Sequence, residues 1–217
     1  MFSFLRASLP PKTFRADDNP IYYEDGASSL EFQAAGSEYL LRNQHPAWDP
    51  KKPSIMVPPF HWHIHQTEHF HVVSGTCHLF RDYATTPWIT ISTTDPALPT
   101  KAVIPKQVYH TINNASTTEP LVLDVNLTPE DYEGEQRFFR NFFGYLDDCR
   151  KAGVPPSPFQ LFVFLHAADT PLGIPMPTRW MGLVAGRVVL WGMNFWGRYI
   201  LGYQPSYPEY YNEKKAL

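Results

Sequence analysis

The sequence has few cysteines, and this scarcity excludes one class of protein. Cys77 and Cys149 are the only cysteines among 217 residues, and they form no CxxC motif. Two free thiols in a reducing compartment are therefore expected rather than a disulfide framework. The first apolar run, within residues 1–15, is short and interrupted by prolines, unlike a secretory signal. We therefore expect a cytoplasmic protein.

The sequence also lacks clustered charge of one sign. The net charge is −3, and the 18 basic residues are scattered along the chain. A nucleic-acid-binding surface needs a basic patch that follows the phosphates, so we expect no nucleic-acid partner. Aromatic residues make up 15% of the chain, which suits a packed core or a flat organic ligand. The expected partner is a small-molecule substrate.

A long uncharged apolar run is the third missing feature. The most apolar stretch, 180–203, contains Arg187 and Arg198, which leave only ten uncharged residues between them. A transmembrane helix needs about 20 apolar residues, so we expect no transmembrane span. Two interpretations of the stretch remain. Its helices pack on the barrel or on the second subunit of an expected homodimer, or its Trp, Phe and Arg side chains make weak contact with a membrane surface.

Proline and short alternating segments are abundant. The 22 prolines indicate many turns and edges, because proline is excluded from helix interiors and central strands. Segments typical of strands recur about every ten residues, as in a sandwich or barrel. The expected strands are 21–23, 29–33, 39–42, 54–64, 68–73, 78–83, 88–93, 102–104, 110–113 and 121–127.

The pattern changes to helical spacing near residue 128. Thr128 and Pro129 are suited to the N-cap and first position of a helix, which we expect to end near residue 151. A second helix is expected over 158–168. The predicted organisation is an N-terminal arm, a β-barrel and a helical C-terminal extension that packs on the barrel or on a partner subunit. Their ranges are 1–20, 21–127 and 128–217.

Histidines cluster in the stretch PPFHWHIHQTEHFHVVSG, residues 58–75, which holds five of them within eleven residues. In an extended chain His61 and His63 point to one face, and Glu68 follows on the next strand. His110, from a second stretch, is a fourth candidate. Three imidazoles and a carboxylate are ligands that suit Fe, Zn, Mn, Ni or Cu and can leave coordination positions open. The alternative is a set of hydrogen-bonded polar side chains in a metal-free barrel.

Other polar residues near this stretch have less defined roles. His65 shares the parity of His61 and His63 and offers an alternative ligand, although its spacing to Glu68 is short. His69 and His71 fall on the strand face opposite Glu68. The candidates for a catalytic part are Tyr109, as proton donor or pocket wall, and His71.

The spacing resembles the two motifs of the cupin superfamily. The pattern His-x-His, four residues, Glu, six residues, Gly is matched by His61, His63, Glu68 and Gly75. The pattern Pro-x-Gly-x-x-His-x-x-x-Asn is matched by Pro105, His110 and Asn114, with Gln107 in place of the glycine. This resemblance, over roughly residues 25–127, implies a mainly β fold. The implied fold is a cupin-type double-stranded β-helix, or jelly-roll barrel, followed here by C-terminal α-helices.

The resemblance also implies a function. Many cupins with this ligand set are metal-dependent enzymes, and the expected activity is that of an Fe(II) dioxygenase acting on a small hydrophobic or aromatic organic metabolite. One divalent ion would be held by His61, His63, Glu68 and His110. Two alternatives stay open. One is a non-redox lyase, decarboxylase, isomerase or cyclase; the other is a small-molecule-binding cupin without catalysis.

Overall fold

A computed structural model describes residues 3–212 and divides the chain into two compact units. The barrel unit is Asn19–Tyr132. The helical unit consists of the described residues before Asn19 and after Tyr132.

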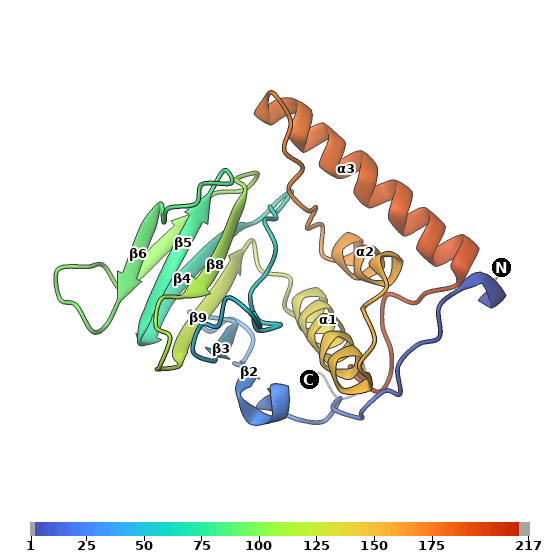
Figure 1. Ribbon diagram of the computed structural model, residues 1–217, viewed down its shortest axis with the longest axis horizontal. Helices are drawn as coiled ribbons and strands as arrows, with labels where there is room; N and C mark the ends of the chain where they lie inside the picture. Colours follow the sequence, from blue (N-terminus) through green and yellow to red (C-terminus); the bar gives the residue numbers. More distant parts are fainter. Residues whose placement is uncertain (1–2, 213–217) are drawn as a thin grey trace. The chain divides into compact units, whose positions relative to one another are not determined.

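The barrel unit consists of antiparallel β-sheets (Figure 1). One sheet has the strand order β1-β2-β3-β9-β4-β7, and the other has the order β6-β5-β8. The strands are β1 (Ile21–Tyr23), β2 (Ser28–Phe32), β3 (Leu41–His45), β4 (Thr67–Ser74), β5 (Thr76–Arg81), β6 (Ile89–Ser92), β7 (Lys101–Ile104), β8 (His110–Asn114) and β9 (Leu121–Thr128).

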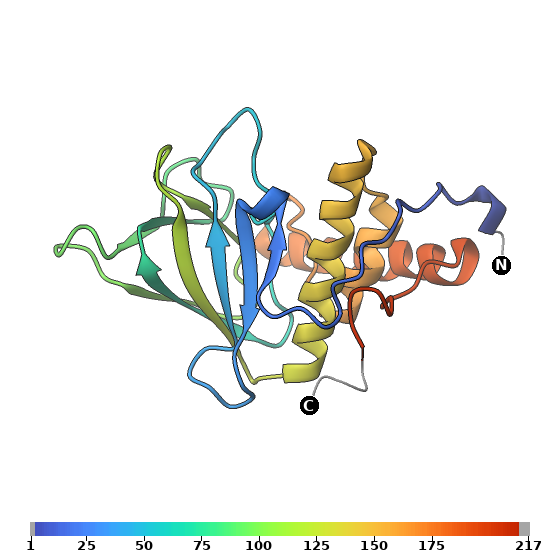
Figure 2. The ribbon, with the colours of Figure 1, turned by 90° about the horizontal axis from the view of Figure 1, so that it is seen from below.

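Alternating burial along these strands shows why they form a barrel. In β2 and β3 every second residue is buried, as expected for strands with one face on a core. The buried side chains include Leu30, Leu41 and Leu123 from the larger sheet and Leu79 and Ile112 from the smaller. The curved strands of the barrel unit are also seen in Figure 2. The predicted mainly β, cupin-type barrel followed by helices is confirmed.

The segment 54–64 differs from the prediction, because it forms no strand. Its only sheet-like contact is an isolated bridge between His61 and His110. Prolines at positions 53, 58 and 59 explain the difference, since each lacks the N–H that a ladder needs. The bridge nevertheless holds His61 in extended pairing beside β8.

The helical unit contains α1 (Tyr132–Ala152), α2 (Pro158–Ala167), α3 (Arg179–Phe195) and a π-helical turn, η3 (Trp196–Leu201). A short 3-10 turn, η1 (Ser3–Leu5), lies near the N-terminus. The second helix lies where the sequence predicts it. The predicted start of α1 was wrong: Thr128 is the last residue of β9, so it cannot cap a helix that begins at Tyr132. No helix among residues 3–212 is long and apolar enough to cross a membrane.

A glycine in α1 provides the first testable prediction. A Cβ at Gly144 would lie 2.7 Å from Cδ1 of Tyr210, whose hydroxyl donates a 2.7 Å hydrogen bond to Asp148 and thereby fixes the ring. Overpacking of this kind costs about 1–3 kcal/mol, more than the roughly 1 kcal/mol by which alanine favours a helix. Gly144→Ala should therefore lower the free energy of unfolding, measured in urea.

The matched control is Gly192→Ala in α3, where an added Cβ has no atom within 4 Å. This variant should gain up to about 1 kcal/mol from helix propensity alone. If Gly144→Ala were as stable as Gly192→Ala, the close packing of Tyr210 on α1 would be disproved.

Candidate metal centre

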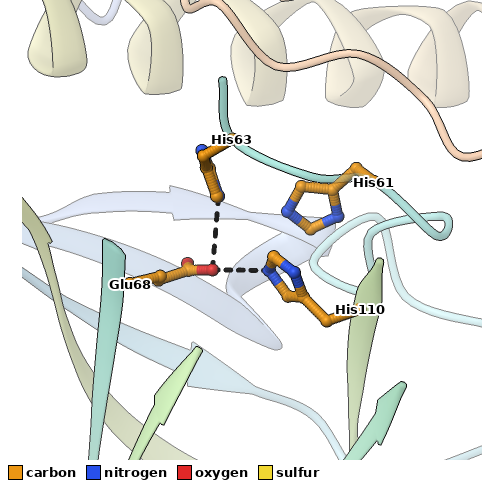
Figure 3. Close-up of side chains that lie close together, drawn as sticks. All are labelled: His61, His63, Glu68 and His110. Carbon is orange, nitrogen blue, oxygen red and sulfur yellow. Dashed lines mark hydrogen bonds and ion pairs between the residues drawn. The ribbon is translucent and has the colours of Figure 1, made fainter. Parts of the chain in front are cut away.

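The four predicted ligands converge although they come from three different parts of the barrel unit (Figure 3). His61 and His63 lie in the irregular segment before β4, Glu68 is in β4, and His110 is the first residue of β8. Paired backbone bonds join His61 to His110, with N···O distances of 3.1 and 2.9 Å. The amide of Gln107 donates to the carbonyl of His63 at 2.9 Å. Backbone pairing therefore positions both histidines against the start of β8.

The side chains meet at short range. One ligand atom from each of the four residues lies within 4.8 Å of all the others. Oε2 of Glu68 lies 2.7 Å from Nε2 of His110 and 3.3 Å from Nε2 of His63. His63, Glu68 and His110 are buried, and His61 is half-buried. The cluster is thus a largely enclosed set of three imidazoles around one carboxylate.

Two backbone carbonyls orient the imidazole rings. Nδ1 of His61 lies 2.9 Å from the carbonyl oxygen of Pro59, and Nδ1 of His110 lies 2.9 Å from that of Val108. A carbonyl oxygen only accepts, so Nδ1 carries the proton and donates, which leaves the Nε2 lone pair for a metal. The sequence analysis did not identify these two carbonyls. No residue-type signal could have marked them, because every residue has a carbonyl.

The electrostatics of the cluster favour the protonation states that bind a metal, a deprotonated carboxylate and neutral imidazole. Burial acts to raise the pKa of Glu68, but the close contacts with the imidazole rings of His110 and His63 outweigh it and hold this pKa well below its ordinary value. Burial, with the nearby His110 and His63, lowers the pKa of His61 well below its ordinary value. At neutral pH Glu68 is therefore a carboxylate and His61 a neutral imidazole.

The donor set fits one divalent metal ion. With the proton of His110 on Nδ1, two acceptor atoms face each other across 2.7 Å, and they repel unless a proton or a cation lies between them. Ligand atoms that bind one ion at about 2.1 Å lie about 3.0 Å apart when adjacent and about 4.2 Å apart when opposite, so the widest pair, at up to 4.8 Å, would need to approach by about 0.6 Å or more. The buried cluster could bind one metal ion, and the residues alone do not specify which.

Gln107 shows how the chain accommodates its departure from the second cupin motif. Gln107 occupies the position of the motif glycine and has a φ of +64°, in the left-handed region that glycine favours. A non-glycine residue there costs about 1–2 kcal/mol. The turn before His110 therefore keeps the conformation that a glycine would allow, and the ligand keeps its position.

The remaining histidines of the stretch 58–75 lie outside the cluster. His65 is exposed, and Nε2 of His69 lies 2.9 Å from Oγ1 of Thr128. His71 stacks on Tyr39 with 5.4 Å between ring centroids, on the strand face opposite Glu68. The predicted parity of His69 and His71 is confirmed. The structure does not bring His71 to the four ligands.

Tyr109, the residue before His110, lies among other aromatic rings. Its buried ring packs edge-on against Trp62, at 6.4 Å between centroids, and tilts against Tyr83 at 5.4 Å. Trp62 lies between His61 and His63 in sequence. Tyr109 thus belongs to an aromatic group with Trp62 and Tyr83.

Comparison with known proteins gives the chain its family. No protein-family model matches it. "Oxidoreductase iacF" of Pestalotiopsis fici is 32% identical over 181 residues, which cover 80% of this chain and 85% of that protein. "Probable oxidoreductase virH" of Hypocrea virens is 29% identical over 94% of this chain and 91% of its own length. The solved structure of KdgF from Halomonas sp. covers 55% of this chain and 96% of its own, at 16% identity and a TM-score of 0.36, a likeness too distant to indicate chemistry. The chain therefore belongs to the same family as oxidoreductase iacF, and it is an enzyme built on a cupin barrel with a buried His-His-Glu-His cluster.

Proposed function

We propose that this enzyme is an Fe(II)-dependent dioxygenase that acts on a small hydrophobic or aromatic organic metabolite. The observation that carries the proposal is the convergence of His61, His63, Glu68 and His110 within 4.8 Å. Imidazole and carboxylate ligands suit ferrous iron, and four protein ligands leave coordination positions for other molecules. Kinship with oxidoreductases favours redox chemistry over the lyase, decarboxylase, isomerase and cyclase alternatives.

The protein residues have separable tasks in this proposal. His61, His63 and His110 would hold the ion through neutral imidazoles, and Glu68 would neutralise part of its charge. A ferrous ion held in this way would supply dioxygen activation and a binding position for the substrate. The carbonyls of Pro59 and Val108 keep two of the imidazole rings in the required tautomer.

The surroundings of Glu68 support an apolar substrate. Its register partners on the two neighbouring strands are Ile104 and Leu127, both buried. The ring of Phe70, two residues along β4, lies 6.4 Å from that of His110. A polar cluster with apolar neighbours excludes water and suits a ligand that presents one polar group and an apolar body.

The test combines metal analysis with oxygen dependence on one preparation. Protein purified without chelator or affinity-tag metal should contain about one iron per chain, the stoichiometry of a single four-ligand site. On a panel of phenolic and polyketide-like compounds, product should form in air with oxygen uptake and should not form under strict anaerobiosis. Full anaerobic turnover would replace this proposal with non-redox chemistry. Tight binding of a compound without any product would indicate a small-molecule-binding protein without catalysis.

A further inference from the structure

The helix α3 has two apolar faces, and the helical unit uses only one of them. Gly182, Gly186, Leu190 and Asn194 are buried, and they recur every four residues along one side of the helix. α3 packs against α2, and the turn that follows α3 does so as well. At Gly197 an added Cβ would lie 2.9 Å from the carbonyl oxygen of Phe159, which shows how closely the backbones approach. One side of α3 is thus committed to the core of its own unit.

The opposite side of α3 is apolar and exposed. Trp180, Val184, Val188, Trp191 and Phe195 follow one another at spacings of three or four residues, so they form one stripe along the helix. Trp180, Val188 and Trp191 are 71%, 66% and 67% exposed. Folding normally buries side chains of this size, and a continuous exposed apolar patch marks an interaction surface.

A second segment of chain extends this surface. Phe4 and Leu5 of η1 are exposed, and η1 lies against η3, the turn that continues α3 (Figures 1 and 2). A 3.0 Å hydrogen bond from Arg6 to the carbonyl of Gly202 fixes the two segments together. The α3 stripe, with Phe4, Leu5 and the exposed Trp196 and Tyr199 of η3, is called the apolar face below.

The charged side chains of α3 and of the segments that flank it in sequence, residues 170–208, are all positive. Between residues 170 and 208 the only charged side chains are Arg179, Arg187 and Arg198, and the range contains no Asp or Glu. Arg187 lies one turn from Trp191 and two turns from Trp180 along the same side of the helix, at the edge of the stripe. Arg198 is exposed, with its guanidinium 5.6 Å from the ring centroid of Tyr199. A partner that matches this pattern is apolar inside and negatively charged at its surface.

We propose that the apolar face docks the protein on the surface of a bilayer that contains anionic lipid. Helices that lie in the membrane interface combine an exposed apolar stripe with basic side chains beside it. Tryptophan and tyrosine rings settle at the level of the lipid headgroups, and arginines there attract anionic lipid. The stripe lies flat on the bilayer in this arrangement and does not cross it.

The test measures binding of the full-length protein to sedimented vesicles of phosphatidylcholine, with and without phosphatidylserine. The protein should bind the vesicles that contain phosphatidylserine, and the binding should weaken as salt is raised. Trp191→Asp removes an anchor and places a negative charge on the apolar face. Arg198→Glu keeps the stripe but reverses one charge. Each variant should lose roughly tenfold or more in affinity for the anionic vesicles.

The control is Tyr22→Asp, which adds the same charge at a side chain of β1 that is 61% exposed and lies outside the helical unit. It should bind like the unmodified protein, and circular dichroism should show that all three variants are folded. The proposal is overturned if the unmodified protein does not bind anionic vesicles at low salt. It is also overturned if Trp191→Asp leaves vesicle binding unchanged. A third contrary result is that the unmodified protein is a dimer that does not bind vesicles and that Trp191→Asp makes it a monomer, since a second copy of the chain would then cover the apolar face.

Discussion

Glu68→Gln is expected to remove the bound metal while leaving the protein folded. The substitution keeps the shape of the side chain but removes the only negative charge among the four ligands. Loss of a residue that merely orients a ligand already costs about 10–100-fold in metal affinity, so loss of a ligand itself should cost at least about 100-fold. The metal content of the purified variant should fall from about one ion per chain to near zero, and oxygen uptake should fall with it.

The variant should not unfold, because an amide can satisfy its neighbour. The side-chain amide of a glutamine can donate to Nε2 of His110, which has no proton when Nδ1 donates to Val108. The matched control is His65→Gln, at an exposed histidine of the same segment that lies outside the cluster. It should retain the metal. A Glu68→Gln protein that kept both its metal and its activity would exclude Glu68 as a ligand.

Arg15→Ala should cost about 3–5 kcal/mol of unfolding free energy, the range measured when one partner of a buried ion pair is removed. Arg15 lies 2.6 Å from Asp147 and 2.9 Å from Asp148, and all three side chains are buried. Thr13 and Tyr210 also donate to Asp148, so this group joins the N-terminal arm and the C-terminal tail to α1. Removing the guanidinium leaves Asp148 without its buried cation, whereas Asp147 keeps its ion pairs with Arg150 and Lys151.

Urea unfolding with matched variants separates charge from packing. Lys12 lies in the same N-terminal arm and forms an ion pair with Glu209, but both side chains are partly exposed. Lys12→Ala should therefore lower the free energy of unfolding by less than about 1 kcal/mol. Arg15→Met retains much of the side-chain volume and should cost nearly as much as Arg15→Ala. Adding Asp148→Asn to Arg15→Met should recover part of the loss. An Arg15→Ala protein as stable as the Lys12→Ala protein would show that this ion pair does not hold the helical unit together.

The sequence predicted the barrel and the grouping of the four candidate ligands better than it predicted the connections. Strand alternation and motif spacing are local properties, so they located Glu68 and His110 and placed His71 on the opposite face. Two local signals gave wrong predictions of secondary structure. The alternation of 54–64 suggested a strand, but its prolines leave only a single bridge at His61. Thr128 and Pro129 suggested a helix start, but sheet pairing with Thr67 keeps Thr128 in β9.

The sequence by itself determined the cupin motifs and the four candidate ligands, because residue type and spacing along a strand decide which side chains share a face. Only the tertiary structure decided the geometry that makes them a site. Backbone pairing of His61 with His110 closes the cluster, and two carbonyls set the ring tautomers. The exposure of the apolar face likewise depends on which side of α3 packs on α2. These features arise from contacts between distant segments, and a linear pattern does not specify them.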